Sequence, residues 1–241
     1  MSPQVATELD ITARDRLAIG LDVPSLDEAL QLAGDVSPWF GVAKVGLELY
    51  SAAGPASVEP LRELRTRVFC DLKLHDIPTT VGRAARVLGR LGVTYLNFHA
   101  AGGVDMLRAG VDGVFDGARE AGRTAPVPLA VTVLTSDPDA SAFDERLAAA
   151  IEAGCGGVVC SVHEIARVKR AQKDFVTVVP GVRAEDGDRH DQARVGSPAQ
   201  IASAGADLLV VGRLVSAAAD RRAAARRVHQ SVADALENRR V

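Results

Sequence analysis

The segment Val68-Phe-Cys-Asp-Leu-Lys-Leu-His-Asp-Ile-Pro78 begins as a run of apolar residues and ends in charged ones. Such a near-continuous apolar run is typical of a strand covered on both faces, as in a parallel sheet. Because side chains alternate along a strand, Asp71 and Lys73 are predicted to share one face, while Cys70 and Leu72 point to the other. The two charges indicate either an interior ion pair or a functional group at the end of the strand.

Similar apolar runs recur along the whole chain. The eight predicted strands are residues 17–23, 41–46, 68–73, 95–99, 129–134, 157–161, 176–180 and 208–212. Segments rich in Ala, Leu, Arg and Glu predict helices at residues 26–33, 56–64, 81–91, 104–121, 143–153, 164–171, 198–204 and 216–236. This alternation predicts an α/β protein in which residues 1–241 form one (β/α)8 TIM barrel domain, with an open doubly wound sheet as the alternative.

Local signals support these boundaries. Ser25 and Ser197 are expected to cap helices, and Pro198 suits a first helical position. Glycines at positions 34, 92 and 122 are expected at helix ends.

Bulk composition narrows the class of protein. The formal net charge of −3 argues against a nucleic-acid or anionic-membrane partner, which a strongly basic face would bind. No apolar run reaches the roughly 18 residues of a membrane span, and residues 1–16 lack the pattern of a secretory signal. Three cysteines without CxxC spacing predict buried thiols. A soluble protein of the reducing cytoplasm is therefore expected.

Charges at two other predicted strand ends extend the pattern of the opening segment. Asp22 lies near the end of the first apolar run, and Lys44 interrupts the second. Because the carboxyl ends of barrel strands surround one opening, Asp22, Lys44, Asp71 and Lys73 are expected to converge there and keep one another ionised. A purely structural charge cluster is the alternative.

A second group of polar residues lies near the end of the chain. Gly212 and Arg213 close the eighth predicted strand, where (β/α)8 barrels frequently bind phosphate. Gly212 would admit a ligand close to the backbone, and Arg213 would supply a forked cationic donor. Arg183 and Gln192 lie in the polar segment 183–192, which is either a solvated loop or a lid that adds phosphate donors.

Two hydroxyl residues follow the fifth predicted strand. Thr135 and Ser136 could hydrogen-bond a polar ring, and for Ser136 a helix cap is the alternative interpretation.

Taken in order, these segments resemble the bacterial type of the orotidine 5′-phosphate decarboxylase family. The resemblance rests on DLKLHDIP at 71–78, preceded by LDV and AKVGLEL and followed by PGVR, a DQ pair and VVGR. DxKxxD alone marks a wider superfamily, whereas the ordered set over about residues 16–214 is specific. The resemblance implies decarboxylation of orotidine 5′-monophosphate to UMP, the last step of UMP biosynthesis. The sequence has no glycine-rich dinucleotide turn after the first predicted strand and no His/Cys metal cluster, so no cofactor or metal is expected.

It also implies roles for individual residues. Lys73 would donate a proton to C6 of the pyrimidine beside Asp71, and Lys44 and Asp76 would complete a Lys-Asp-Lys-Asp array, with Asp76 supplied by the neighbouring subunit of a homodimer. The remaining implied contacts are Asp22 and Lys44 to the ribose, Thr135 to the pyrimidine, Thr79 across the dimer interface, and Arg183, Gln192, Gly212 and Arg213 to the phosphate. His75 and His99 lie in matched segments and receive no role.

Two rival functions fit parts of this pattern. The first is a Mg²⁺-dependent sugar-phosphate decarboxylase or hexulose-phosphate synthase of the same superfamily, and resemblance to those relatives implies that a carboxylate of the second strand helps bind the metal. Here Lys44 stands in that place, and its ammonium would repel a divalent cation. A non-catalytic phosphate-binding barrel would need Gly212 and Arg213 but would have no use for Asp71 and Lys73.

Overall fold

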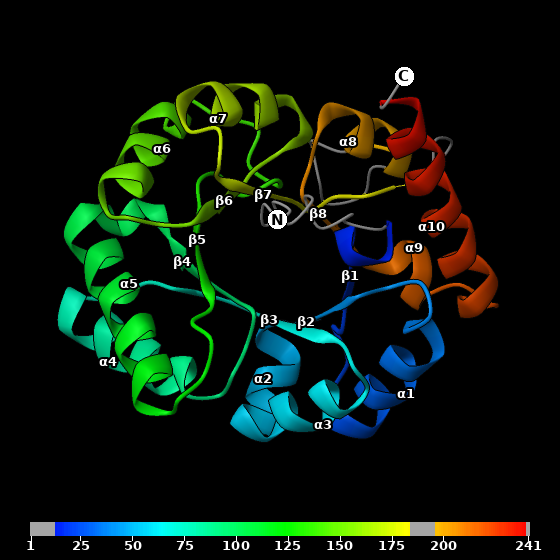
Figure 1. The fold of residues 1–241 in the computed structure, drawn as a ribbon, viewed down its shortest axis with the longest axis horizontal. Helices are drawn as coiled ribbons and strands as arrows, with labels where there is room; N and C mark the ends of the chain where they lie inside the picture. Colours follow the sequence, from blue (N-terminus) through cyan, green and yellow to red (C-terminus); the bar gives the residue numbers. More distant parts are fainter. Residues whose placement is uncertain (1–12, 184–195, 240–241) are drawn as a thin grey trace, which may run out of the picture.

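Eight parallel strands hydrogen-bond in chain order and close into a barrel in the computed structural model, which describes residues 13–183 and 196–239 (Figure 1). Closure occurs at β1, where Ala18 pairs with Val42 of β2 on one side and with Val210 of β8 on the other. The strands are β1 (Leu17–Gly20), β2 (Val42–Val45), β3 (Arg67–Leu74), β4 (Tyr95–His99), β5 (Val127–Val131), β6 (Gly157–Val159), β7 (Val176–Val179) and β8 (Leu208–Val211). The predicted barrel is confirmed, and the open sheet is wrong.

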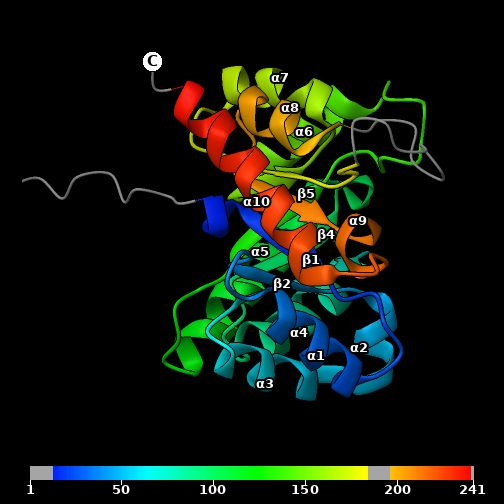
Figure 2. The same cartoon turned by 90° about the vertical axis from the view of Figure 1, so that its right-hand side faces the viewer.

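Helices surround the barrel (Figures 1 and 2). They are α1 (Leu26–Val36), α2 (Leu47–Ala53), α3 (Val58–Glu63), α4 (Pro78–Gly89), α5 (Gly103–Glu120), α6 (Phe143–Glu152), α7 (Ile165–Ala171), α8 (Pro198–Ala204), α9 (Arg213–Ser216) and α10 (Arg221–Asn238). The first and last long helices, α1 and α10, pack side by side and complete the ring. Among the described residues, no helix is both long and apolar enough to cross a membrane.

Two helices differ from the sequence prediction. The predicted strand 41–46 runs directly into α2, whose N-cap residue Gly46 has no side chain to mark the start. The predicted helix 216–236 starts too early. The short helix α9 ends at Ser216, and α10 begins at Arg221, where the Asp220 carboxylate accepts a hydrogen bond from the Ala223 N–H at 2.9 Å. An acidic N-cap of this kind is a regular start signal that the sequence prediction missed.

The predicted caps agree with the structure except at one glycine. The Ser25 hydroxyl accepts from the Glu28 N–H at the start of α1, and Ser197 forms a capping box with Gln200 ahead of Pro198.

Gly92 and Gly122 have positive φ just beyond α4 and α5. Gly34 was expected at a helix end but lies inside α1, which runs on to Val36.

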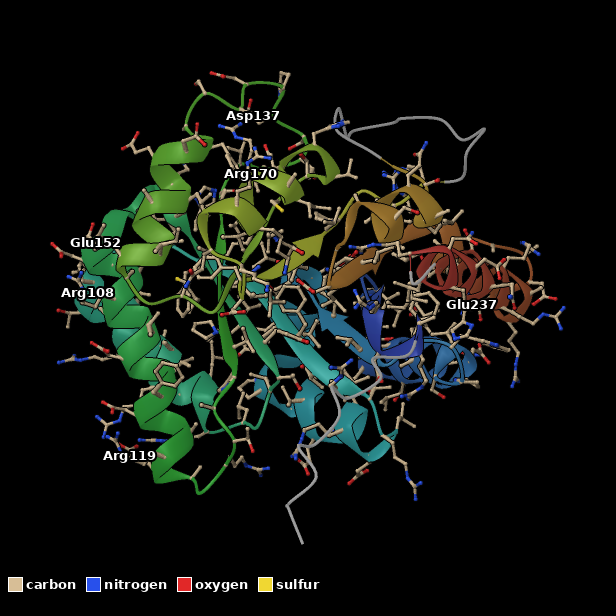
Figure 3. All side chains as sticks on the ribbon, turned by 45° about the horizontal axis from the view of Figure 1, so that its top comes forward. Arg108, Arg119, Asp137, Glu152, Arg170 and Glu237 are labelled. Atoms are coloured by element: carbon tan, nitrogen blue, oxygen red, sulfur yellow. The ribbon has the colours of Figure 1, made fainter. Side chains whose placement is uncertain are left out.

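Two apolar layers follow from strand alternation. Phe69 points into the barrel, where its ring meets that of Tyr95 edge to face at 5.9 Å. Its neighbour Cys70 points outward into the layer between strands and helices. Polar side chains occupy the outer surface of the helix ring, as Arg108 of α5 and Glu152 of α6 do, with 3.6 Å between their charged atoms (Figure 3). The inner layer thus fills the interior of the barrel between the strands.

Helices α4 and α5 approach each other closely because glycines line their contact. A Cβ at Gly117 of α5 would lie 2.0 Å from the backbone oxygen of Arg86 on α4, and a Cβ at Gly113 would lie 2.2 Å from that of Gly82. These distances are far below van der Waals contact, so the packing requires glycine at both positions.

We predict that Gly117→Ala lowers the free energy of unfolding by about 2 kcal/mol, because the added methyl group forces α4 and α5 apart. Gly34→Ala is the matched control, since no atom lies within 4 Å of its added Cβ. That variant should gain roughly 0.5–1 kcal/mol from the better helix propensity of alanine. Urea denaturation of both variants measures the difference, and equal stability would contradict the packing argument.

Candidate active site

A cavity of about 530 Å³ opens at the carboxyl ends of the barrel strands. Eight of the residues expected at a functional site contribute to its wall: Asp22, Lys44, Asp71, Lys73, Thr135, Arg183, Gly212 and Arg213. They come from segments far apart in the sequence and meet because the barrel places all strand ends around one opening.

Four charged side chains form a continuous array in this wall. The Lys44 ammonium lies 3.0 Å from the Asp22 carboxylate and 3.3 Å from that of Asp71. The other oxygen of Asp71 lies 2.6 Å from the ammonium of Lys73. Asp71 therefore accepts from two cations, in the order Asp22, Lys44, Asp71, Lys73. This array confirms the predicted convergence of charges from the first three strands.

Burial and charge act in opposite directions on the inner pair of the array. Desolvation by burial favours the neutral forms, but the Lys44 and Lys73 ammonium groups outweigh it and lower the pKa of Asp71. Desolvation likewise works against the Lys44 ammonium, which is only 7% exposed, yet Asp71 and Asp22 raise its pKa. Both side chains are thus held in their charged forms.

The backbone at Lys73 departs from regular strand geometry. Its φ is +49°, and among the described residues Arg65 is the one other non-glycine residue with positive φ. On β3, residues 71–73 lie between Cys70, which pairs with Leu96 of β4, and Leu74, which pairs with Phe98. One residue of β4, Asn97, faces this bulge. A left-handed lysine costs on the order of 1–3 kcal/mol. Strand alternation correctly predicted that Asp71 and Lys73 lie together, but it did not predict this strained backbone.

Two predicted site residues lie outside the cavity of this chain. Asp76 is exposed, and its carboxylate accepts from the backbone N–H of Ile77 at 2.6 Å. Thr79 is exposed in the first turn of α4. Neither contributes to the cavity wall, so one chain forms the array without Asp76. Gln192 lies outside the described residues.

The structure also decides the open interpretation of Ser136. Ser136 lines the cavity beside Thr135, and the N-cap of the following helix α6 is Ala142. The capping interpretation is therefore wrong.

Two contributors to the site were missed in the sequence. Asn97 is fully buried and donates from its amide nitrogen to the Asp71 carboxylate at 2.6 Å. Its signal was a single polar residue within the apolar run 95–98. Gly46 leaves room for the array, because a Cβ there would lie 2.7 Å from Asp22 Oδ1 and 3.0 Å from Lys44 Nζ.

These features define a (β/α)8 barrel with a charged ligand site at its carboxyl end. The model of the orotidine 5'-phosphate decarboxylase / HUMPS family matches residues 15–228. The chain belongs to this family.

Individual relatives agree with that assignment. The chain is 47% identical over 230 residues to an orotidine 5'-phosphate decarboxylase of Moorella thermoacetica, covering 90% of this chain and 91% of that protein. It is 43% identical over 243 residues to one of Heliobacterium modesticaldum, covering 94% and 99%. The crystal structure of orotidine 5'-phosphate decarboxylase from Lactobacillus acidophilus superposes with a TM-score of 0.74 at 32% identity, covering 90% of this chain and 99% of that chain.

The lowered pKa of Asp71 predicts a pH dependence of stability. Because the folded protein binds this proton more weakly than the unfolded chain does, the stabilisation is present above about pH 4 and is lost as the pH falls through the folded-state pKa. Between about pH 5 and pH 3, the free energy of unfolding should therefore fall more steeply in the wild type than in Asp71→Asn. Urea denaturation along this range measures both slopes.

Asp112→Asn controls for the change in net charge, because it removes an exposed carboxylate from α5. If the slope of Asp71→Asn equals that of the wild type, the Asp71 carboxylate does not contribute to acid sensitivity.

Proposed function

We propose that this protein decarboxylates orotidine 5′-monophosphate to UMP and CO₂, the last step of UMP biosynthesis. The observation that carries the proposal is the Lys73 ammonium, fixed 2.6 Å from Asp71 at the wall of a 530 Å³ cavity. Family membership supports the same reaction, since relatives that match nearly the whole chain are named orotidine 5'-phosphate decarboxylase.

The reaction requires stabilisation of negative charge at C6 of the pyrimidine. When the bond from C6 to the carboxylate breaks, its electron pair stays on C6 and CO₂ leaves. In our proposal the Lys73 ammonium stabilises this developing charge and then transfers a proton to C6, which completes UMP. Asp71 holds the ammonium before the substrate arrives, so little reorganisation is needed during the reaction.

The part of the cavity wall that follows β7 and β8 suits the substrate phosphate. Arg183 and Arg213 line it, and a Cβ at Gly212 would meet no atom within 4 Å, so the backbone there is open to a ligand. We assign the phosphate to these residues and to Gln192, the ribose to Asp22 and Lys44, and the pyrimidine to Thr135. Phosphate binding away from C6 would let remote affinity contribute to the rate.

The metal-dependent rival fits this geometry poorly. The Lys44 ammonium occupies the space between the carboxylates of Asp22 and Asp71, where a divalent cation held by both would have to lie. We therefore propose a reaction without a metal or organic cofactor.

We predict that Lys73→Ala lowers kcat by at least about 1,000-fold, because it removes both the charge and the proton donor. Loss of orotate absorbance in the ultraviolet measures the reaction. Lys169→Ala is the matched control: its ammonium also pairs with one carboxylate, that of Asp207 at 2.7 Å, but it does not line the cavity. That variant should keep wild-type kcat.

Near-normal turnover by folded Lys73→Ala would refute the assignment of the proton donor. Complete loss of wild-type activity after EDTA treatment would instead favour the metal-dependent reaction.

We further propose a homodimer with shared active sites. Asp76 and Thr79 are exposed beside Ile77, which is 66% exposed although apolar. A second subunit placed against this edge would cover Ile77 and bring Asp76 to the neighbouring Lys73. The arrangement would place Asp76 next to Lys73 and complete the Lys-Asp-Lys-Asp order, of which one chain supplies Lys44, Asp71 and Lys73.

Mixing inactive Asp76→Asn and Lys73→Ala subunits tests this arrangement. Each mixed dimer would contain one site with both native residues, so random exchange should restore about a quarter of the wild-type activity. Native mass spectrometry would verify that mixed dimers form. Mixed dimers without activity would exclude site sharing.

We propose that the whole chain acts as one catalytic domain in the cytoplasm, on a small-molecule substrate and without a nucleic-acid or membrane partner. All three cysteines are buried free thiols, and burial raises the pKa of Cys70 and Cys155 to about 12. Such thiols suit a reducing compartment.

A further inference from the structure

We infer that Asn97 is a positioning residue, which sets both the backbone of Lys73 and the carboxylate of Asp71. This inference rests on the function proposed above, because it assigns Asn97 a task in that reaction. Asn97 is fully buried on β4, at the position that faces the bulge of β3.

The two hydrogen bonds of Asn97 join the parts of the bulge. The backbone N–H of Lys73 donates to Asn97 Oδ1 at 2.7 Å, and Asn97 Nδ2 donates to Asp71 Oδ1 at 2.6 Å. A backbone N–H can only donate and a carboxylate can only accept, so the orientation of the amide is determined. Asparagine is the residue of this size that supplies one acceptor and one donor at once.

The first of these bonds compensates for the irregular strand. Residues 71–73 of β3 face one residue of β4, so the regular backbone ladder is interrupted there. The Asn97 side chain provides the acceptor that the Lys73 N–H needs inside the protein. It thereby holds lysine in a left-handed conformation that non-glycine residues adopt rarely.

The second bond fixes the partner of the reacting ammonium. Asp71 Oδ1 accepts from both Asn97 and Lys73, at 2.6 Å each. Without the amide, this carboxylate could rotate towards Lys44 and release Lys73. Because Asn97 lies behind both residues and does not line the cavity, its effect on substrate binding should be small.

The first test is Asn97→Leu, which keeps the branched shape and the number of side-chain heavy atoms and removes both hydrogen bonds. We expect kcat to fall about 100-fold, the usual scale for a misplaced reacting group, with KM within about twofold of the wild type. Thr132→Val is the matched control, because Thr132 is also fully buried and loses one side-chain hydrogen bond, to the Val159 carbonyl at 3.0 Å. It should lose stability but keep kcat.

The second test is Asn97→Asp, in which a carboxyl group replaces the amide. Only its protonated form can donate to Asp71, so activity should approach the wild-type value at low pH and fall as that proton is lost. Asp71 contacts Asn97 directly, and Lys73 and Lys44 pair with that carboxylate. His99, two residues along β4, stacks on His75, which follows β3. These groups are present in the wild type as well, so the additional pH step is read from the ratio of the two kcat profiles.

A kcat of folded Asn97→Leu within threefold of the wild type would overturn the inference. If that variant fails to fold, parallel pH profiles of Asn97→Asp and the wild type would overturn it. If neither variant folds while Thr132→Val does, Asn97 serves the fold and the inference is again overturned. An inactive wild type would instead refute the proposed function.

Discussion

The carboxylate of Asp71 accepts contacts from two ammonium groups and one amide at the end of β3. A carboxylate buried without such partners would be neutral, and the ammonium groups would lose the charge that balances them. The array is therefore stable only as a set, and each member depends on a strand that brings it to the same opening. The strand order supplies that condition, because β1, β2, β3 and β4 are parallel neighbours whose carboxyl ends lie side by side at the mouth.

Sequence reasoning recovered the features that depend on regular patterns. Apolar runs located all eight strands, and the charges that interrupt them located Asp22, Lys44, Asp71 and Lys73. It failed where the backbone is irregular or where no residue type marks the start of an element. Lysine is not a residue type that predicts a left-handed backbone, and the conformation of Lys73 is explained by the bulge of β3 against β4. Helix α2 was missed because glycine precedes it without a capping side chain.

Along β3, the residues that stabilise the barrel are different from the residues that carry charge. Phe69 fills the barrel and Cys70 packs under the helices, whereas the next residues carry charge and strain. Within a few residues one strand changes from core to reactive group. The core residues can thus hold the barrel rigid while the strained end presents its ammonium to a ligand.

The glycine contacts between α4 and α5 act on the same region from outside. Helix α4 begins at Pro78, close after the end of β3, and its backbone touches that of α5 at Gly113 and Gly117. Contacts between backbones cannot relax by changes of rotamer, so α4 has little freedom to slide or rotate. The segment that carries Asp76 and Thr79 is consequently a preformed surface. Docking of another molecule there would cost this segment little conformational entropy, and association would not have to wait for the segment to fold.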